Sequence, residues 1–307
     1  MRVVVTGGAG FIGANLCSHL ADEGHEVIAL DDLSTGRAAN LEGLGVKLVE
    51  GSILDRPLVH DVVSGADAVV HLAARGSVPR SLLDPLATHE VNVTGTAEVL
   101  EAARAAGVGH VLFSSSSSVY GANPTLPKHE DLLPSPVSPY AASKLAGEAT
   151  ALAYQRSFGL PVLVLRFFNV FGPLQPADHD YAAVVPRFVD AALAGRPAEV
   201  HGDGGQSRDF TYVGTVVRVL AQALTTTVTA DGPVNLAFGS RITLLEVLTE
   251  IEHLLGHPVE RHHVGPRAGD VRHSQADASR LHSLFPDIRP VPFPDGLSRT
   301  VDWFRAR

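Results

Sequence analysis

The sequence predicts an α/β fold: a doubly wound parallel sheet followed by a smaller mixed α/β lobe at its C-terminal end. Short β-branched runs alternate with helical patterns over the first half of the chain, which is typical of parallel sheets with helices on both faces. A glycine-rich turn, residues 6–13, joins the first run to the first helix. After Gly172-Pro173 the chain becomes polar and contains prolines. We therefore expect a sheet domain over 1–172, to which 207–237 returns, and a lobe over 173–307.

Local patterns predict the elements in chain order. Apolar and β-branched runs bounded by turn residues predict strands over 2–5, 26–30, 48–53, 68–74, 110–114, 161–168 and 234–237. Apolar residues at helical spacing predict helices over 14–23, 85–107, 181–193, 216–224 and 244–255, and one more between 53 and 68. A further helix is expected within 135–158, after a proline-bounded loop. Most strands are thus followed by a helix, as parallel pairing requires.

Composition narrows the class of protein. The 307 residues are 45% hydrophobic, enough for a large core, and the net charge of −9 argues against a nucleic-acid partner. A single cysteine, Cys17, rules out an intramolecular disulfide and a cysteine zinc cluster. His253, His257, His262 and His263 lack the spacing of a ligand set, so no metal is expected. The first residues do not resemble a signal peptide and no apolar run suits a membrane span, so we expect a cytoplasmic protein without a membrane partner.

The glycine-rich turn predicts a dinucleotide site. Gly7, Gly10 and Gly13 fit G-x-x-G-x-x-G, while Gly8, Gly10 and Gly13 fit G-x-G-x-x-G. Such glycines permit a tight turn, and the free N–H groups of the following helix attract phosphates. Asp31 ends the second strand, at the distance where a carboxylate accepts hydrogen bonds from an adenosine ribose. The combination favours NAD over NADP; the alternative is a glycine-rich turn without a ligand.

A second set of residues indicates acid–base chemistry. Tyr140 and Lys144 are four residues apart, so they lie on one face of a helix, and an ammonium beside a phenol favours the phenolate. Ser116 follows the apolar strand 110–114, at the end where open α/β sheets bind their ligands. Tyr-x-x-x-Lys alone is common on surface helices. Together with Ser116 and a cofactor, it predicts a base, its helper and a hydroxyl that holds the reacting oxygen.

With these motifs in place, the chain resembles the extended short-chain dehydrogenase/reductases that act on nucleotide sugars, and looks most like UDP-galactose and UDP-N-acetylglucosamine 4-epimerases. The resemblance covers almost the whole chain and rests on residues 6–13, 31–37, 71–74, 114–121, 140–144, 166–173, 181–186, 202–210 and 266–270. It implies a Rossmann fold, NAD as the cofactor and a UDP-sugar as the substrate. It also implies a homodimer, formed through the helices after Pro85 and Tyr140.

The resemblance implies roles for individual residues. The implied catalytic residues are Ser116, Tyr140 and Lys144. The implied cofactor-binding residues are Gly7, Gly10, Phe11, Ile12, Gly13, Asp31, Asp32, Ser34, Thr35, Gly36, Ser52, Ile53, Leu72, Ala73, Ala74, Asn92, Ser114, Tyr140, Lys144 and Phe167. The implied substrate-binding residues are Ser77, Ser116, Ser117, Tyr140, Asn169, Ala183, Val184, His201, Arg208, Arg267, Asp270 and Ser274. Arginines suit a diphosphate because guanidinium groups bind it through charge-assisted hydrogen bonds.

The implied reaction is epimerisation of a UDP-hexose at C4, with UDP-N-acetylglucosamine accepted alongside UDP-glucose. Tyr140 removes the proton of the 4-hydroxyl while hydride passes from C4 to NAD. The 4-keto sugar then turns over and receives hydride on its other face, so no external redox partner is needed. Ser116 is expected to hold the 4-oxygen, and Lys144 to lower the Tyr140 pKa and hydrogen-bond the nicotinamide ribose.

Departures from the family pattern bear on the substrate. Ser117 and Ser118 stand where similar dehydratases carry an Asp-Glu pair, so the general acid for elimination is missing. Ser274 stands where related epimerases vary between tyrosine and a small residue, which leaves room for a 2-acetamido group. Ser52 replaces an aspartate that contacts adenine. Arg75, at the edge of the site, is expected to point to water.

Several alternatives stay open at this point. One is a UDP-glucuronate 4-epimerase or decarboxylase, although family members acting on that sugar usually carry threonine in place of Asn169. Others are a different nucleotide-sugar dehydratase or ketoreductase, and a Rossmann protein that senses NAD without turnover. The physiological sugar and the nucleotide base are likewise open.

Overall fold

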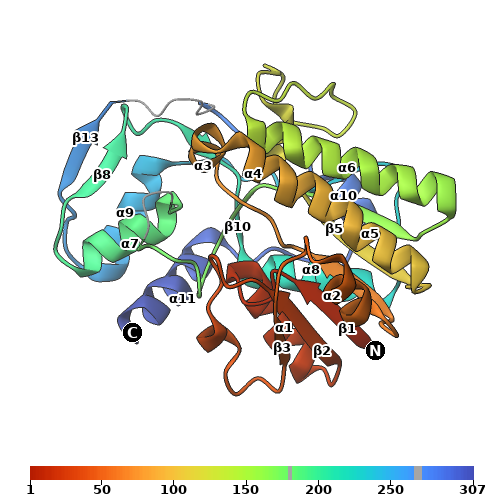
Figure 1. Ribbon diagram of the computed structural model, residues 1–307. Coiled ribbons are helices and arrows are strands. Elements are labelled where there is room, and N and C mark those ends of the chain that lie inside the picture. The colour runs from red at the N-terminus through yellow and green to blue at the C-terminus, as the bar shows by residue number, and fades with distance from the viewer. Residues whose placement is uncertain (179–181, 266–271) are drawn as a thin grey trace.

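The computed structural model describes residues 1–178, 182–265 and 272–307. Its centre is a seven-stranded parallel sheet with the strand order β11-β6-β5-β4-β1-β2-β3 (Figure 1). The strands are β1 Arg2–Thr6, β2 Glu26–Asp31, β3 Lys47–Glu50, β4 Ala68–His71, β5 His110–Ser116, β6 Val162–Phe167 and β11 Val234–Leu236. The predicted doubly wound parallel sheet is confirmed.

Helices cover both faces of this sheet. Those packed around it are α1 Phe11–Asp22, α2 Arg56–Val63, α3 Val78–Leu83, α4 Pro85–His89, α5 Gly95–Ala105, α6 Pro139–Phe158 and α8 Val213–Thr225, with the short turns η1 Ala38–Leu41, η2 Glu90–Thr94 and η3 Ser117–Tyr120. α1 and α8 bury one face, whereas α2, α5 and α6 bury the other. Since side chains alternate along a strand, Val3 and Val5 enter the first apolar cluster and Val4 enters the second.

The lobe stands beside the sheet domain, on the left in Figure 1, and consists of short elements. They are β7 Asn169–Phe171, α7 Val184–Leu193, β8 Ala198–His201, β9 Ser207–Arg208, β10 Phe210–Tyr212, β12 Ile242–Thr243, α9 Leu244–Leu255, β13 Arg261–Val264 and α11 Phe293–Arg305. The short helix α10 Ser279–Leu284 packs instead against β11 of the main sheet, on the right in Figure 1. β7 pairs with β10 and β8 with β13, both parallel, while β9 and β12 are antiparallel. Between β10 and β12 the chain returns to the main sheet, where β11 pairs with β6. The limits 1–172 and 173–307 stay predictions.

Most differences from the expected elements lie at element ends. The helix expected over 14–23 begins at Phe11, directly after the glycine turn. The strand expected over 68–74 ends at His71, because residues 72–74 line a cavity instead. The helical pattern over 85–107 is divided into α4, the π-helical turn η2 and α5. α3 and the two- to four-residue strands of the lobe were not expected, since such short segments carry no clear period.

The topology fixes where a ligand site lies. β1 pairs with β2 on one side and with β4 on the other, so the strand order reverses between β1 and β4. In open α/β sheets ligands bind in the crevice outside the carboxyl ends at such a point. The glycine turn after β1 and the segment after β4 meet there. A Cβ on Gly7, whose φ is +71°, would lie 2.8 Å from the Ala73 backbone nitrogen, so this approach requires glycine.

Candidate active site

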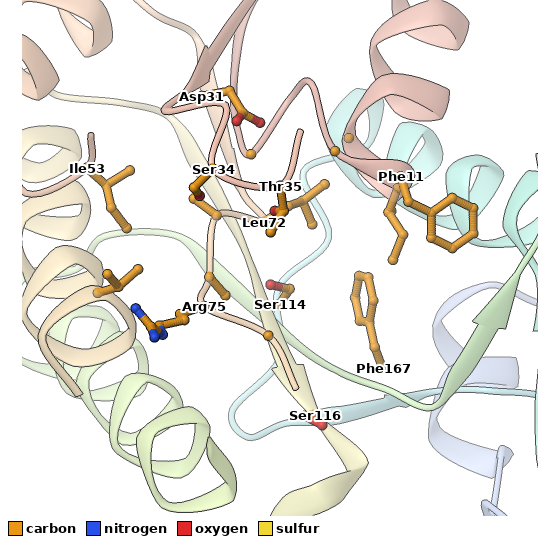
Figure 2. Close-up of a pocket in the computed structure, with 18 of the residues that line it drawn as sticks. Phe11, Asp31, Ser34, Thr35, Ile53, Leu72, Arg75, Ser114, Ser116 and Phe167 are labelled. Atoms are coloured by element: carbon orange, nitrogen blue, oxygen red, sulfur yellow. The ribbon is translucent and has the colours of Figure 1, made fainter. Parts of the chain in front are cut away.

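A cavity of about 480 Å³ opens at the crevice between β1 and β4. Figure 2 shows Ile53 and Arg75 on one side of it, Phe11 and Phe167 on the other, and Ser114 between them. All predicted cofactor-binding residues line this first cavity except Gly36, Ser52 and Asn92. Its volume lies within the range of roughly 300–1,000 Å³ that is usual for ligand and cofactor pockets.

The walls of the first cavity suit a dinucleotide. α1 begins after Gly10 with no side-chain cap and no acidic residue in its first turn, so its N–H groups are available for phosphate. The Asp31 carboxylate is held in place, since Oδ2 accepts from the Ala9 N–H at 2.9 Å and Oδ1 from the Leu33 N–H at 2.9 Å. Burial raises the Asp31 pKa, and these N–H groups counter it in part. These residues fit NAD, with the turn facing its pyrophosphate and Asp31 its adenosine ribose.

Three predicted cofactor residues are not among those that line the first cavity. Gly36 packs against Asp31, since a Cβ there would lie 2.8 Å from the carboxylate. Ser52 Oγ accepts from the Leu54 N–H at 3.2 Å. Asn92 is 2% exposed and lies in η2; its Oδ1 accepts from the Arg75 N–H at 2.7 Å and its Nδ2 donates to Ser143 Oγ at 2.9 Å. Asn92 therefore supports the cavity wall rather than lining it.

The predicted catalytic residues come together in the first cavity. Ser116 Oγ accepts from the Ser118 N–H at 3.1 Å and from the Ser118 hydroxyl at 2.9 Å, so its own proton is left to donate. Ser116 is also hydrogen-bonded to the Tyr140 side chain. One helical turn further, Lys144 Nζ donates to Ser114 Oγ at 3.5 Å. The strand end and the helix thus bring a hydroxyl, a phenol and an ammonium to one place.

Burial dominates the pKa values of the two titratable groups. It raises the pKa of Tyr140, and the hydrogen bond with Ser116 lowers that pKa only in part. It lowers the pKa of Lys144 to about 8, because the ammonium loses water deep in the protein. The Tyr140 pKa is thus raised, against the expected lowering by Lys144, because a buried phenolate is costly.

A second cavity, of about 530 Å³, adjoins the first. The predicted substrate-binding residues that line it are Ser77, Tyr140, Asn169, Ala183, Val184, His201 and Arg208. Ser116 faces the first cavity, whereas Ser117 and Ser274 line neither. Arg267 and Asp270 lie outside the described residues. Tyr140 lines both cavities and so stands at the boundary between them.

Among the lining residues that the sequence analysis did not place in the site, three polar side chains matter most here. Gln175 is 8% exposed, lines both cavities and donates from Nε2 to the Val170 carbonyl at 3.1 Å. Arg80 lines the first cavity. Arg75 also lines it and pairs with Asp84 at 3.1 Å, which corrects the expectation that it points to water. Gln175 and Arg80 belong to no recognisable spacing, so nothing in the sequence marks them.

Over the three described stretches of the chain, no helix combines the length and apolarity needed to cross a membrane. The same stretches contain no group of three histidine, cysteine, aspartate or glutamate side chains placed to hold a metal ion.

Comparison with known proteins decides the family. The model of the "NAD dependent epimerase/dehydratase family" matches residues 3–237. The chain belongs to this family. It is 39% identical to the UDP-glucose 4-epimerase of Mycolicibacterium smegmatis over the whole of this chain and 99% of that relative. The predicted family, and NAD as its cofactor, are confirmed.

Solved structures agree in fold over the full length. The UDP-glucose 4-epimerase of Thermotoga maritima, solved with UDP-glucose, matches with a TM-score of 0.95 and 33% identity, over 100% of this chain and 99% of that one. The UDP-glucose 4-epimerase of Thermus thermophilus, solved with NAD, matches with a TM-score of 0.90 and 36% identity, over 99% of each chain. Similar proteins also carry the names of uronate epimerases, decarboxylases and dehydratases. The chain is thus an enzyme of this family, with the sugar left undecided.

Proposed function

We propose that the enzyme interconverts UDP-hexoses at C4 through a transient 4-keto sugar. The observation that carries this proposal is the position of Tyr140, which lines both the cavity that fits NAD and the second cavity. A sugar bound in the second cavity would meet the cofactor at this phenol. Asn169 and Arg208 line the second cavity and supply donors suited to a diphosphate.

Each catalytic residue has a distinct part in the proposed reaction. NAD, when bound, accepts hydride from C4 and returns it. Tyr140 takes the proton of the 4-hydroxyl and later gives it back. Ser116, whose oxygen already accepts two hydrogen bonds from Ser118, donates its proton to the 4-oxygen and so favours the ketone. Lys144 supplies positive charge beside Tyr140 and a donor towards the cofactor.

The acids of the site argue against dehydration, which needs a carboxyl group beside the catalytic hydroxyl. Asp31 and Asp32 are the carboxylates among the described residues that line the first cavity, and Asp31 is tied to backbone N–H groups. Glu199, in the second cavity, pairs with Arg187 at 2.9 Å. The positions after Ser116 hold serines.

The size of the residue at position 274 concerns which sugars the enzyme can accept. Its N–H donates to the Ser207 carbonyl at 3.1 Å, which places it next to Arg208 in the lobe. We propose that a small residue at this position admits a 2-acetamido group, so that UDP-N-acetylglucosamine is used alongside UDP-glucose. Ser274→Tyr is expected to lower kcat/KM for the acetamido sugar much more than for UDP-glucose. Equal losses for the two sugars would remove the basis of this assignment.

A homodimer is also proposed. Leu82, Leu83 and Leu86, on α3 and α4, are 55%, 75% and 81% exposed, which is unusual for neighbouring leucines. They lie in and just before the region of Pro85 that the family resemblance suggests as a dimer contact. A second copy of the chain would cover them.

The function is tested by proton NMR of the purified enzyme with UDP-glucose, UDP-N-acetylglucosamine and UDP-glucuronate in separate samples. The C4 epimer of the first, and of the second, is expected to appear. Epimerisation of the glucuronate alone would favour a uronate epimerase. A product that has lost carbon dioxide or water would favour a decarboxylase or a dehydratase. Absence of any product, with NAD added, would reject the proposal.

A further inference from the structure

Arg80 stands at a junction that no part of the proposed mechanism uses. It lies on α3 and lines both the first cavity and a third cavity of about 320 Å³. Gly10, Phe11 and Thr35 also line both of them. The Arg80 side chain therefore reaches the same place as the glycine turn and the first residue of α1.

The guanidinium of Arg80 has no partner in the described part of the chain, whereas its neighbours do. Arg75 pairs with Asp84 at 3.1 Å, and Arg37 pairs with Asp178. The Arg80 side chain is half-buried, so it has lost part of its water without gaining a counter-charge. Partly buried charges are normally paired, because desolvation is otherwise uncompensated. An anionic ligand would supply the missing partner.

α3 holds Arg80 in this orientation. The helix begins at Val78 behind the cap residue Ser77, whose Oγ accepts from the Arg80 N–H at 3.3 Å. Ser77 has a φ of +92°, a conformation that serine rarely adopts. The backbone that presents Arg80 is therefore fixed by a cap at an unusual turn, between the segment after β4 and the exposed leucines.

The N-terminus of α1 brings further positive character to the two cavities that Arg80 lines. α1 starts there with no side-chain cap and no acidic residue in its first turn. Asp31 and Asp32, the carboxylates of the first cavity, follow β2, where the fit places the adenosine ribose. A ligand that lies where these cavities meet would thus have both the helix N–H groups and a guanidinium among its neighbours. This suits a doubly charged group such as a pyrophosphate.

We propose that Arg80 is a counter-charge of the dinucleotide pyrophosphate and binds it together with the N-terminus of α1. The proposal rests on NAD as the cofactor of the family and not on the identity of the sugar. Arg80 is then a cofactor-binding residue contributed by α3, outside the glycine turn and the Asp31 strand. The competing assignment is to the diphosphate of the sugar nucleotide, because the third cavity shares Ser77, Gln175 and Ala183 with the second.

The test compares three variants in binding assays, without turnover. Arg80→Met removes the charge at similar length, Arg80→Lys keeps the charge, and Arg104→Met removes an exposed arginine that lines neither cavity. Calorimetry on protein freed of nucleotide gives the Kd for NAD, ADP-ribose, adenosine and UDP. Thermal unfolding of each variant serves as the control for correct folding.

Arg80→Met is expected to raise the Kd for NAD and for ADP-ribose by roughly tenfold or more, as the loss of a charge-assisted hydrogen bond implies. Arg80→Lys should raise the Kd for NAD less than Arg80→Met does, and Arg104→Met should leave it unchanged. The Kd for adenosine and for UDP should stay the same in all three variants. A weaker salt dependence of NAD binding in Arg80→Met would agree. A Kd for NAD within about twofold of the original would overturn the proposal. So would a loss confined to UDP, or an equal loss for adenosine.

Discussion

Lys144 carries a charge that the proposed chemistry needs but that destabilises the folded protein. Its side chain is 4% exposed, and burial lowers its pKa from the ordinary 10.5 to about 8. One pKa unit corresponds to about 1.4 kcal/mol, so charging Lys144 costs the folded protein about 3 kcal/mol at pH 7. Lys144→Met keeps the length and removes this cost.

Part of the stability that Lys144→Met gains is offset by the contacts that the ammonium group makes. Lys144 Nζ lies 5.1 Å from the centroid of the Phe113 ring and 3.5 Å from Ser114 Oγ. A cation over an aromatic ring contributes about 0.5–2 kcal/mol. Lys144→Met is therefore expected to stabilise the nucleotide-free protein by about 1–2 kcal/mol at pH 7, while turnover is lost.

The pH dependence has a definite sign. Because the folded pKa lies below the unfolded one, the unfolded chain binds more protons between about pH 8 and 10.5, so this group makes the original protein more stable as pH rises. Lys144→Met lacks that slope, so its advantage should shrink above pH 8 and vanish near 10.5. Urea unfolding at pH 7, 8.5 and 10 measures the difference in stability between Lys144→Met and the original protein. Lys47→Met, at an exposed lysine, is the control. If Lys144→Met is less stable than the original protein at pH 7, the reasoning is refuted.

Three further predictions concern catalysis, the core and assembly. Tyr140→Phe is expected to lower kcat by at least about 100-fold with the Kd for UDP unchanged, because it removes only the proton acceptor; near-normal kcat would reject Tyr140 as the base. Arg166, whose side chain is 2% exposed, pairs with the Glu148 carboxylate at 2.6 Å. Glu148→Gln removes that charge and should lower the free energy of unfolding in urea by about 3 kcal/mol. A loss below about 1 kcal/mol would contradict this. Leu86→Glu is expected to convert a dimer into a monomer in light scattering, whereas a monomeric original protein would exclude the dimer.

The long elements of the fold were predictable because their patterns are long. The strand at 110–114 has the apolar run Val111-Leu112-Phe113 at its centre, and α6 begins at Pro139 after a proline-bounded loop, so the sequence indicates both. Elements of two to six residues, such as α3 and β9, depend on tertiary pairing and carry no period of their own. The division of the 85–107 helix at η2 is likewise a consequence of packing, which no local pattern records.

The site was predictable where chemistry and spacing coincide. The glycine turn, Asp31 and the Tyr140–Lys144 pair are marked by residue type and interval, and the structure brings them to one cavity. Gln175 lies in a loop, and Arg80 looks like any surface arginine in the sequence. For Asn92 the cofactor contact stays a prediction, and the structure adds that its amide binds the Arg75 N–H and Ser143 Oγ.

The most direct test of the account follows the hydrogen at C4. UDP-glucose and UDP-N-acetylglucosamine labelled with deuterium at C4 are incubated with the enzyme in ordinary water, and the products are analysed by NMR. The epimers are expected to keep the deuterium at C4, because the hydride is removed and returned within one pocket. Loss of deuterium to the solvent, or failure of both sugars to epimerise, would contradict it.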